Sequence, residues 1–381
     1  MKAIYLYVFI LFFSINSFAQ QITFNWDHEL LPQGYSLQPH LNSSTIGFGN
    51  PSFLSRFEEI SAGLSFQYGM QIKKVYFGGL QGKSLINGMP YAAGASFHSG
   101  GFYIGAAIAQ KYNLKLENPD IKITTAENPD GIGKSIKFLE SRDIHDYSLI
   151  SAYRINKLSG NNSLSLGIRM SLERLSYYDN GSITIPEIDA SAYAVSFAVG
   201  ADYMLSTGPG DLHLGASFEK GAKFNKDIMV ETPASTYVTY TNRDIGQGNQ
   251  LASTFRIEVI TPDILRLDLA MDLPGVQVTA SLAEVFWSSV MQNYKNNLDI
   301  GAGVSYKASD RLSLFLNAYM NDRKYAKFNP LMPEYDAFFI SPGADAVFGS
   351  YTVGFSISDS HLFSAETRKQ TIGFLSLEYK F

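Results

Sequence analysis

Alternation of residue types with a period of two is the feature that most restricts how this chain can fold, and it is clearest over residues 370–381. One face of this segment carries Thr371, Gly373, Leu375, Leu377, Tyr379 and Phe381. The other face carries Ile372, Phe374, Ser376, Glu378 and Lys380. Because successive side chains of a β-strand point to opposite faces, this pattern predicts a strand with one apolar face and one mixed, charge-bearing face.

The same alternation recurs along the chain, for example over residues 163–173, 297–307 and 311–322. In the sequence, no segment repeats apolar residues at the i, i+3, i+4, i+7 spacing of an amphipathic helix over three turns, so we predict an all-β protein. The apolar faces need either a second sheet, as in a soluble β-sandwich, or lipid around a membrane barrel. Short and long connections alternate regularly, which favours the barrel.

Both ends of the sequence indicate export to a membrane. A terminal amphipathic strand that ends in phenylalanine resembles the assembly signal of bacterial outer-membrane β-barrels. Residues 1–19 read as a secretory signal peptide, with a basic Lys2, an apolar run over residues 3–13 and a small-residue cleavage pattern at Ser17–Ala19. The later sequence has no stretch that approaches 18 apolar residues. We therefore expect a protein of the cell outer membrane of a Gram-negative bacterium, in contact with outer-membrane lipids.

Residues 60–381 predict a transmembrane antiparallel β-barrel of about 14 strands. The count takes residues 249–260 as one strand and 263–287 as the next, with a turn at Thr261–Pro262 between them. It also ends a strand at residue 343, with a turn at Gly343–Asp345. An even number of strands places the start of the first strand and the C-terminus on the same side of the barrel.

Composition and motifs favour a protein that is not an enzyme. The chain has no cysteine, a net charge of −5 and six scattered histidines, so we predict no metal site, no cofactor and no nucleic-acid partner. Residues 78–84 and 131–135 resemble phosphate loops but lack the first glycine of the motif. We find no Gly-x-Ser-x-Gly motif and predict no catalytic residue. His213 is followed on its own face by Gly215, not by a serine, so we expect it simply to face the lumen.

Charged residues on the predicted inner faces allow two interpretations. They are Arg169, Glu173, Glu219, Arg256, Glu258, Arg266, Asp268 and Asp299. One interpretation is a path for protons or ions. The other, which we favour, is a network of ion pairs that fills and braces a narrow lumen.

Residues 20–59 precede the first predicted strand and show little alternation. They carry apolar side chains that include Phe48, Phe53, Leu54 and Phe57. A free periplasmic tail has no use for this much apolar surface, so we predict a hatch, or plug, folded inside the barrel. The alternative is a periplasmic tail.

Several short motifs resemble those of the FadL/TodX-type outer-membrane transporters. Residues 47–57 read G-F-G-N-P-S-F-L-S-R-F and are similar to the Asn-Pro-containing segment that precedes the first strand in that family, with Asn50 and Pro51 as the hatch motif. Phe286-Trp287-Ser288 and the strand after it are similar to the family's Trp-Ser stretch and its glycine-and-tyrosine strand. Asp310-Arg311 and the residues after them resemble the next hairpin.

The resemblance implies a monomeric, 14-stranded barrel that is closed by an N-terminal hatch and takes up a hydrophobic small molecule, such as a long-chain fatty acid or an aromatic hydrocarbon. In such proteins the ligand moves to a pocket near the hatch and leaves sideways through a kink in the third strand. Here that strand is predicted over residues 102–112, with Gly105 as the candidate lateral opening. The candidate ligand-binding residues are Phe48, Phe53, Leu54 and Phe57.

A second class of function stays open at this point. A FadL-related barrel can also act as a docking or shuttle protein of a secretion system, with exported proteins or other secretion-system proteins as partners. The predicted long loop over residues 113–143 is polar and carries several lysines in or beside it, including Lys111, which favours protein docking over lipid uptake.

Overall fold

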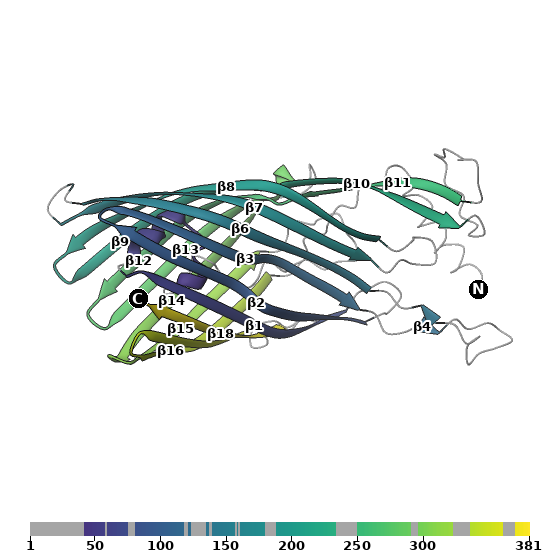
Figure 1. Cartoon of the computed structure of the whole chain (residues 1–381). Coiled ribbons are helices and arrows are strands. Elements are labelled where there is room, and N and C mark those ends of the chain that lie inside the picture. Colours follow the sequence, from purple (N-terminus) through teal and green to yellow (C-terminus); the bar gives the residue numbers. More distant parts are fainter. Residues whose placement is uncertain are drawn as a thin grey trace.

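The computed structural model of the chain is a closed antiparallel β-barrel of 14 strands (Figure 1). It describes residues 42–57, 59–74, 81–117, 121–122, 135–136, 139–156, 158, 161–179, 188–233, 250–290, 296–322, 336–360 and 370–381. The barrel strands are β1 (Ser61–Lys74), β2 (Gln81–Ser99), β3 (Phe102–Glu117), β6 (Leu139–Asn156), β7 (Ser163–Asp179), β8 (Ile188–Thr207), β9 (Gly210–Lys220), β12 (Asp263–Leu273), β13 (Val276–Phe286), β14 (Asn297–Ser309), β15 (Leu312–Asp322), β16 (Asp336–Phe348), β17 (Tyr351–Asp359) and β18 (Gln370–Lys380).

The barrel closes where its first and last strands meet. Strands β1 and β18 pair in antiparallel register from Ser61↔Lys380 to Gln71↔Gln370. Every other barrel strand pairs with the barrel strands that precede and follow it in the chain. The predicted fold class and the predicted number of strands are therefore confirmed. The predicted signal peptide, residues 1–19, lies outside the described residues.

The alternation in the sequence sorts side chains between the outside and the inside of the barrel. On β7, Met170 is 60 % exposed on the outer face, whereas Arg169 beside it is 1 % exposed on the inner face. On β18, Leu375 and Leu377 face outward and Ile372 is buried inside. Large apolar side chains are exposed on the outer faces of most barrel strands and together form an apolar band around the barrel. In membrane β-barrels, lipid covers such a band.

Short turns gather at one end of the barrel, which we call the turn end. They include the connections at Gly100, Gly275 and Gly349, whose φ angles of 60°, 76° and 64° suit glycine. The C-terminus lies at this end too (Figure 1). The opposite end carries a two-stranded ribbon, β10 (Lys223–Pro233) and β11 (Gln250–Ile260), so we call it the ribbon end. A second small sheet pairs β4 (Ile121–Lys122) with β5 (Ser135–Ile136).

The predicted boundaries near residue 260 are wrong, although the total of 14 strands is right. Residues 250–260 form β11 of the ribbon and are not a barrel strand, and the predicted strand 263–287 is the hairpin β12–β13. Thr261–Pro262 is a kink and not a turn. The kink is fixed by hydrogen bonds between Ala222 and Thr261, and a Cβ atom on Gly221 would lie 1.9 Å from the Thr261 carbonyl oxygen.

The predicted turn at Gly343–Asp345 is also wrong. Strand β16 continues through these residues to Phe348, and the turn lies at residues 349–350. Gly343 serves a different purpose, because it pairs with Phe315 of β15 and a Cβ atom on it would lie 2.2 Å from the Phe315 ring. An aromatic ring covering a strand glycine keeps the sheet continuous where the sequence suggested a break.

Candidate functional site

The hatch segment lies inside the barrel as two short 3-10 helices, η1 (Ser43–Thr45) and η2 (Pro51–Arg56), near the turn end (Figure 1). An asparagine side chain caps each helix: Asn42 Oδ1 accepts from the amide of Ser44 at 2.9 Å, and Asn50 Oδ1 accepts from that of Ser52 at 3.0 Å. Pro51 occupies the first position of η2, where its missing N–H would have no helical partner.

Two cross-strand pairs of glycines allow these helices to lie against the wall. Gly63 of β1 pairs with Gly94 of β2 beneath η1, and Gly167 of β7 pairs with Gly200 of β8 beneath η2. A Cβ atom on Gly94 would lie 2.1 Å from a carbonyl oxygen of η1, and one on Gly200 would lie 1.9 Å from the side-chain oxygen of the η2 cap. Any other residue at these positions would push the hatch off the wall.

Asn50 joins the hatch to the backbone of the barrel. Its Nδ2 donates to the carbonyl oxygens of Ala201 on β8 and Ala216 on β9, at 3.0 and 3.2 Å. Its Oδ1 accepts from both the amide and the hydroxyl of Ser52. Both the oxygen and the nitrogen of the buried amide are therefore hydrogen-bonded. A buried polar side chain without such partners would destabilise the fold.

An ion-pair chain ties the end of η2 to the neighbouring wall strands β8, β9 and β12. Arg56 binds Asp202 of β8 with two hydrogen bonds, at 2.7 and 3.0 Å, and its guanidinium lies 3.9 Å from the centre of the Phe53 ring. His213 Nδ1 lies 3.2 Å from Asp202, and His213 Nε2 lies 3.5 Å from Asp272 at the end of β12. His213 thus faces the lumen, as predicted, and acts as a link in the hatch attachment.

Further hydrogen bonds attach the hatch to four other strands. They run from Ser43 N to Glu378 of β18, from Ser55 Oγ to Ser165 of β7, from Arg154 of β6 to the Ser55 carbonyl, and from Arg169 of β7 to the Gly49 carbonyl, and in addition the hydroxyls of Ser44 and Ser65 of β1 lie 2.5 Å apart. The described part of the hatch is therefore fixed along an arc of wall from β18 to β9.

The four apolar hatch residues singled out in the sequence are all buried, but they do not form one surface. Phe48 packs in a cluster with Tyr91, Ala92, Ala109, Ile372 and Phe374. Leu54 and Phe57 pack in another cluster with Ile46, Tyr103, Ala107, Ile150 and Ala152. Phe53 lies over Gly215, whose Cβ would be 3.0 Å from the ring. The structure therefore gives these side chains packing partners in the wall, and ligand contact by them stays a prediction.

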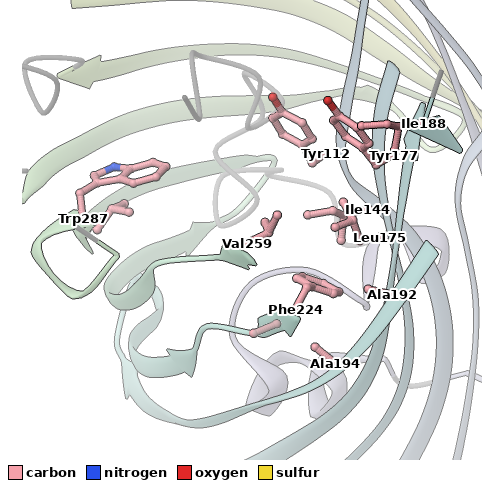
Figure 2. Close-up of a cluster of buried hydrophobic side chains, with 12 residues drawn as sticks. Tyr112, Ile144, Leu175, Tyr177, Ile188, Ala192, Ala194, Phe224, Val259 and Trp287 are labelled. Atoms are coloured by element: carbon pink, nitrogen blue, oxygen red, sulfur yellow. The ribbon is translucent and has the colours of Figure 1, made fainter. Parts of the chain in front are cut away.

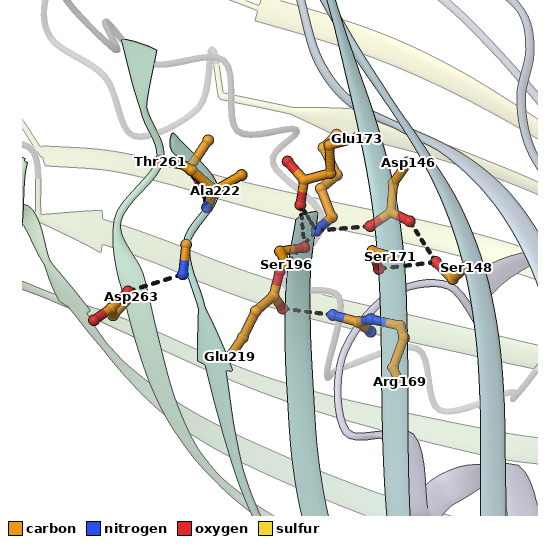
Figure 3. Close-up of polar contacts among 12 residues, drawn as sticks. Asp146, Ser148, Arg169, Ser171, Glu173, Ser196, Glu219, Ala222, Thr261 and Asp263 are labelled. Atoms are coloured by element: carbon orange, nitrogen blue, oxygen red, sulfur yellow. Dashed lines mark hydrogen bonds and ion pairs between the residues drawn. The ribbon is translucent and has the colours of Figure 1, made fainter. Parts of the chain in front are cut away.

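Six charged residues from one arc of wall, strands β3, β6, β7, β9 and β12, form a belt on the ribbon side of the hatch, and Figure 3 shows Asp146, Arg169, Glu173 and Glu219 among them. Lys111 Nζ lies 2.7 Å from Asp146, 2.8 Å from Glu173 and 2.8 Å from Glu219. Glu219 also binds Arg169 at 2.6 Å and lies 3.4 Å from Arg266. This charge belt, Lys111, Asp146, Arg169, Glu173, Glu219 and Arg266, supports the predicted interpretation of inner-face charges as a bracing network.

Lys111 reaches the belt because strand β3 bulges at this residue. Pairing with β6 shifts between Gln110↔His145 and Tyr112↔Ile144, so Lys111 has no partner in the ladder. A bulge re-aims a side chain and breaks the alternation from which sequence reasoning assigns faces. In the sequence, Lys111 was grouped with the polar loop over residues 113–143. Lys111 is therefore the one cation of the belt that was not predicted to face the lumen.

An apolar cluster lies next to the belt on the side of the ribbon end, as the neighbouring positions Ile144 and Asp146 on β6 indicate, and Figure 2 shows its side chains. Its members are buried and come from the inner faces of five barrel strands (β3, β6, β7, β8 and β13), from the start of the ribbon and from the residue after β13: Tyr112, Ile144, Leu175, Tyr177, Ile188, Ala192, Ala194, Ala222, Phe224, Val259, Val285 and Trp287. Trp287 begins the short helix η3 (Trp287–Ser289) after β13. The kink at residues 221–222 and 261–262 brings the ribbon residues Phe224 and Val259 into this cluster.

Residues of the belt and of the apolar cluster occupy successive inner-face positions on the same strands. Asp146 follows Ile144 by two positions on β6, and Leu175 follows Glu173 by two on β7. From the turn end to the ribbon end, the described lumen is therefore layered: hatch, charge belt, apolar cluster. Sequence reasoning found the hatch and most of the belt, but it did not single out the apolar cluster.

The barrel wall is interrupted at the height of the belt, between β2 and β3. Pairing runs from Ser99↔Phe102 to Ala92↔Ala109 and resumes only at Ser84↔Leu116. We call residues 85–91 and 110–115 the wall interruption; it is the longest break in pairing between barrel strands that the structure describes. Gln67 of β1 donates to Gln110 at 3.2 Å, and Gln110 donates to Asp143 at 2.8 Å, so a polar chain lies across it.

Gly105, the candidate lateral opening, lies in a continuous stretch of the ladder. It pairs with Ser96 of β2 and with Ile150 of β6. A Cβ atom on Gly105 would lie 2.9 Å from Ile46 and 3.1 Å from Leu54, so the hatch packs directly on this residue. An opening at Gly105 stays a prediction, whereas the break in pairing lies further along β3.

Other candidates fall partly or wholly outside what the structure describes. Of the phosphate-loop candidate at 78–84, residues 81–84 are described and begin strand β2, whereas the candidate at 131–135 lies outside the described residues except for Ser135. The side chains of Arg256 and Glu258 are not described. Within the described ranges, no group of three or more His, Asp or Glu residues is arranged to hold a metal ion. No helix in that part of the chain is long and apolar enough to cross a membrane.

Solved structures of similar fold include two toluene transporters and a FadL homologue. The Pseudomonas putida toluene transporter TodX aligns with a TM-score of 0.61 at 15 % identity, over 88 % of this chain and 94 % of TodX. A Pseudomonas aeruginosa FadL homologue aligns with a TM-score of 0.59 at 15 % identity, over 91 % and 96 % of the two chains. The Ralstonia pickettii toluene transporter TbuX aligns with a TM-score of 0.58 at 12 % identity, over 89 % and 94 %.

The resemblance found in short sequence motifs is thus confirmed at the level of the fold. No protein-family model and no curated protein matches the sequence. The closed barrel with its apolar outer band defines an outer-membrane type of β-barrel, and its fold is that of FadL/TodX-type transporters.

Proposed function

We propose that the protein carries hydrophobic small molecules across the outer membrane, with the ribbon end outside the cell and the turn end in the periplasm. One observation supports this most directly: the buried apolar cluster lies inside the barrel, beyond a hatch and a charge belt that occupy the lumen beneath it. An apolar ligand gains free energy by leaving water for such a cluster, at about 25 cal/mol for each Å² of apolar surface buried. The structures of similar fold include toluene transporters and a FadL homologue, which supports the proposal.

The charge belt makes the straight axial route unfavourable for such a ligand. Passing the belt would separate Lys111 from three carboxylates in a buried setting, and breaking one buried ion pair already costs about 3–5 kcal/mol. The wall interruption lies at the same height, next to the Lys111 bulge. We therefore infer that the ligand leaves sideways into the membrane through the wall interruption.

Phe48 is the hatch residue placed to gate that exit. It packs against Tyr91 and Ala92 of β2 and against Ala109 of β3, where the pairing of these strands stops. The η2 half of the hatch is held by Arg56 and Asn50 farther around the wall. In this proposal, ligand binding displaces the η1 half, including Phe48, while η2 stays attached.

The first test is to purify the barrel from outer membranes in mild detergent and to identify small molecules that copurify by mass spectrometry. A stoichiometric apolar compound is the expected result. The second test deletes residues 20–59: we expect a folded barrel that leaks small solutes across a planar bilayer. A folded deletion variant that does not conduct would contradict the role of this segment as a plug.

Docking of exported proteins is the second candidate function. The observation that favours it is the ribbon β10–β11, which projects beyond the barrel at the ribbon end (Figure 1). Under this alternative, the purified barrel would be free of apolar ligand and would retain a protein partner, and removal of residues 228–253 from the ribbon would abolish that association.

A further inference from the structure

Lys111 is the belt cation nearest to the apolar cluster in the chain, because it precedes the cluster residue Tyr112. Its ion pairs therefore bear on whether a ligand in the cluster can carry a negative charge. An ammonium group has three N–H donors. Two of them form hydrogen bonds to Glu173 and Glu219 at 2.8 Å, and Asp146 lies 2.7 Å away as a third carboxylate. A ligand carboxylate would have to displace one of these partners to reach the ammonium group.

The other cations of the belt are engaged in the same way. Arg169 donates to Glu219 and to the Gly49 carbonyl, and Arg266 lies 3.4 Å from Glu219. The belt therefore contains three cations and three anions, so it offers no net attraction to an incoming anion. An anion brought into this site loses its hydration without gaining a new partner, which is the costly case for a buried charge.

A further carboxyl group makes the lumen near the belt still less favourable for an anion. Asp268 lies two residues from Arg266 on the inner face of β12 and is 8 % exposed. Neither of its oxygens has a hydrogen-bond partner among the described residues. Asp268 lies on the hatch side of the belt, where its side chain and the Phe53 ring both approach Gly215, so it adds a carboxyl group and no cation to the lumen between hatch and belt.

We infer that the site selects uncharged hydrophobic molecules, such as hydrocarbons or esters, and discriminates against fatty-acid anions. This inference rests on the proposed function and narrows its substrate class from fatty acids or hydrocarbons to neutral compounds. Asp146, Glu173 and Glu219 act as specificity-determining residues because they neutralise Lys111. The apolar cluster itself contributes equally to the binding of either kind of chain.

Trp287 provides a direct probe of the cluster. The chain has two tryptophans, so Trp26→Phe leaves Trp287 as the only one, buried in the cluster. A dibrominated long-chain fatty acid and its methyl ester share one chain and one quencher and differ only in charge. Titration of each into the detergent-solubilised protein, at a pH that ionises the free acid, compares the two ligands at the same site.

We expect the ester to quench Trp287 at a concentration at least about tenfold lower than the acid, a difference of about 1.4 kcal/mol. Asp146→Asn together with Glu173→Gln should improve quenching by the acid about tenfold and leave the ester unchanged, since it frees the Lys111 charge. Asp345→Asn, on the inner face of β16 outside the belt, is the matched control and should change neither. Lys111→Met should weaken the acid further, and it serves as the test if the double variant does not fold.

The outcomes separate this inference from the proposed function. Two results would overturn the inference while leaving hydrophobic transport intact. One is that acid and ester quench Trp287 equally in the protein with an unsubstituted belt. The other is that the folded double variant shows the same ratio of acid to ester quenching concentrations as that protein. Absence of quenching by both ligands would count against the proposed transport site itself.

Discussion

Asn50 of the hatch and Gly200 of the wall lie so close that a single methyl group on Gly200 would be 1.9 Å from Asn50 Oδ1. The contact leaves no space between η2 and β8, so the seal of the hatch depends on the absence of a side chain in the wall. Overpacking such a contact typically costs about 1–3 kcal/mol and shifts the backbone.

Gly200→Ala should therefore lift η2 from the wall and open a leak in a barrel that still folds. We expect ion conductance in planar bilayers well above that of the unsubstituted protein, with the heat-modifiable mobility of a folded barrel preserved on gels. Gly373→Ala on β18 is the control, because the nearest atom to its added Cβ is 3.7 Å away. Equal conductance of both variants would show that the hatch does not rely on this contact.

The ion pair between Arg56 and Asp202 should contribute much more to hatch attachment than an exposed pair does. Asp202 is 3 % exposed and binds Arg56 through both of its oxygens. Removing one member of a buried pair can cost up to about 3–5 kcal/mol, and here we expect about 2 kcal/mol because Arg56 is partly solvated. Asp202→Asn should make the hatch sensitive to added protease at a denaturant concentration that leaves the barrel intact.

The exposed pair between Lys380 and Glu59 provides the comparison for that prediction. Both side chains are about half exposed, at 47 % and 57 %, and such pairs contribute less than about 1 kcal/mol. Glu59→Gln should leave the hatch as resistant to protease as before. A hatch equally sensitive in both variants would indicate general loosening rather than loss of the Arg56 contact.

The polar chain across the wall interruption should restrain the lateral exit. Gln110→Ala removes the partner of both Gln67 and Asp143, and each buried group left unsatisfied costs about 1–3 kcal/mol. We expect faster uptake of an apolar substrate by cells that carry this variant, together with lower barrel stability. Gln277→Ala, which removes a hydrogen bond to Asp272 at the turn end, should lower stability without faster uptake.

Sequence alternation predicted the faces of the strands well but not which sheet each strand joins. The total of 14 was right because two errors cancelled: β11 was counted as a barrel strand, and β12 and β13 were counted as one. Alternation is the same in a barrel and in a ribbon, so it cannot reveal the kink at Gly221 and Thr261, which depends on contacts between distant residues.

The site was predictable where its residues alternate and hidden where they do not. Arg169, Glu173 and Glu219 obey the period of their strands and were assigned to the lumen. Lys111 stands at a bulge, where the period is broken, so only the pairing of β3 with β6 reveals its direction. Ile144 and Leu175, which pair with each other in the apolar cluster, face inward next to polar residues such as His145 and Arg174. At this height the apolar side chains are therefore on the inner face, the reverse of the pattern in the rest of these strands, and alternation alone assigns the faces wrongly.

Two engineered disulfides can show which half of the hatch moves. The chain has no cysteine, so any pair introduced is unique. Ser44 and Ser65 lie with their hydroxyls 2.5 Å apart and join η1 to β1; Ser55 and Ser165 lie 2.7 Å apart and join η2 to β7. These separations place both pairs of side chains within reach of a disulfide bond.

We expect oxidation of the Ser44→Cys/Ser65→Cys variant to stop uptake of an apolar substrate, because it holds the half of the hatch that carries Phe48 against the wall. Oxidation of the Ser55→Cys/Ser165→Cys variant should leave uptake close to normal, and a reducing agent should restore the first variant. Inhibition only by the η2 disulfide would instead mean that the hatch swings from its η1 end and that the ligand takes the axial route. Such a result would refute the sideways exit, because an axial ligand must pass the charge belt that Lys111 and its three carboxylates form.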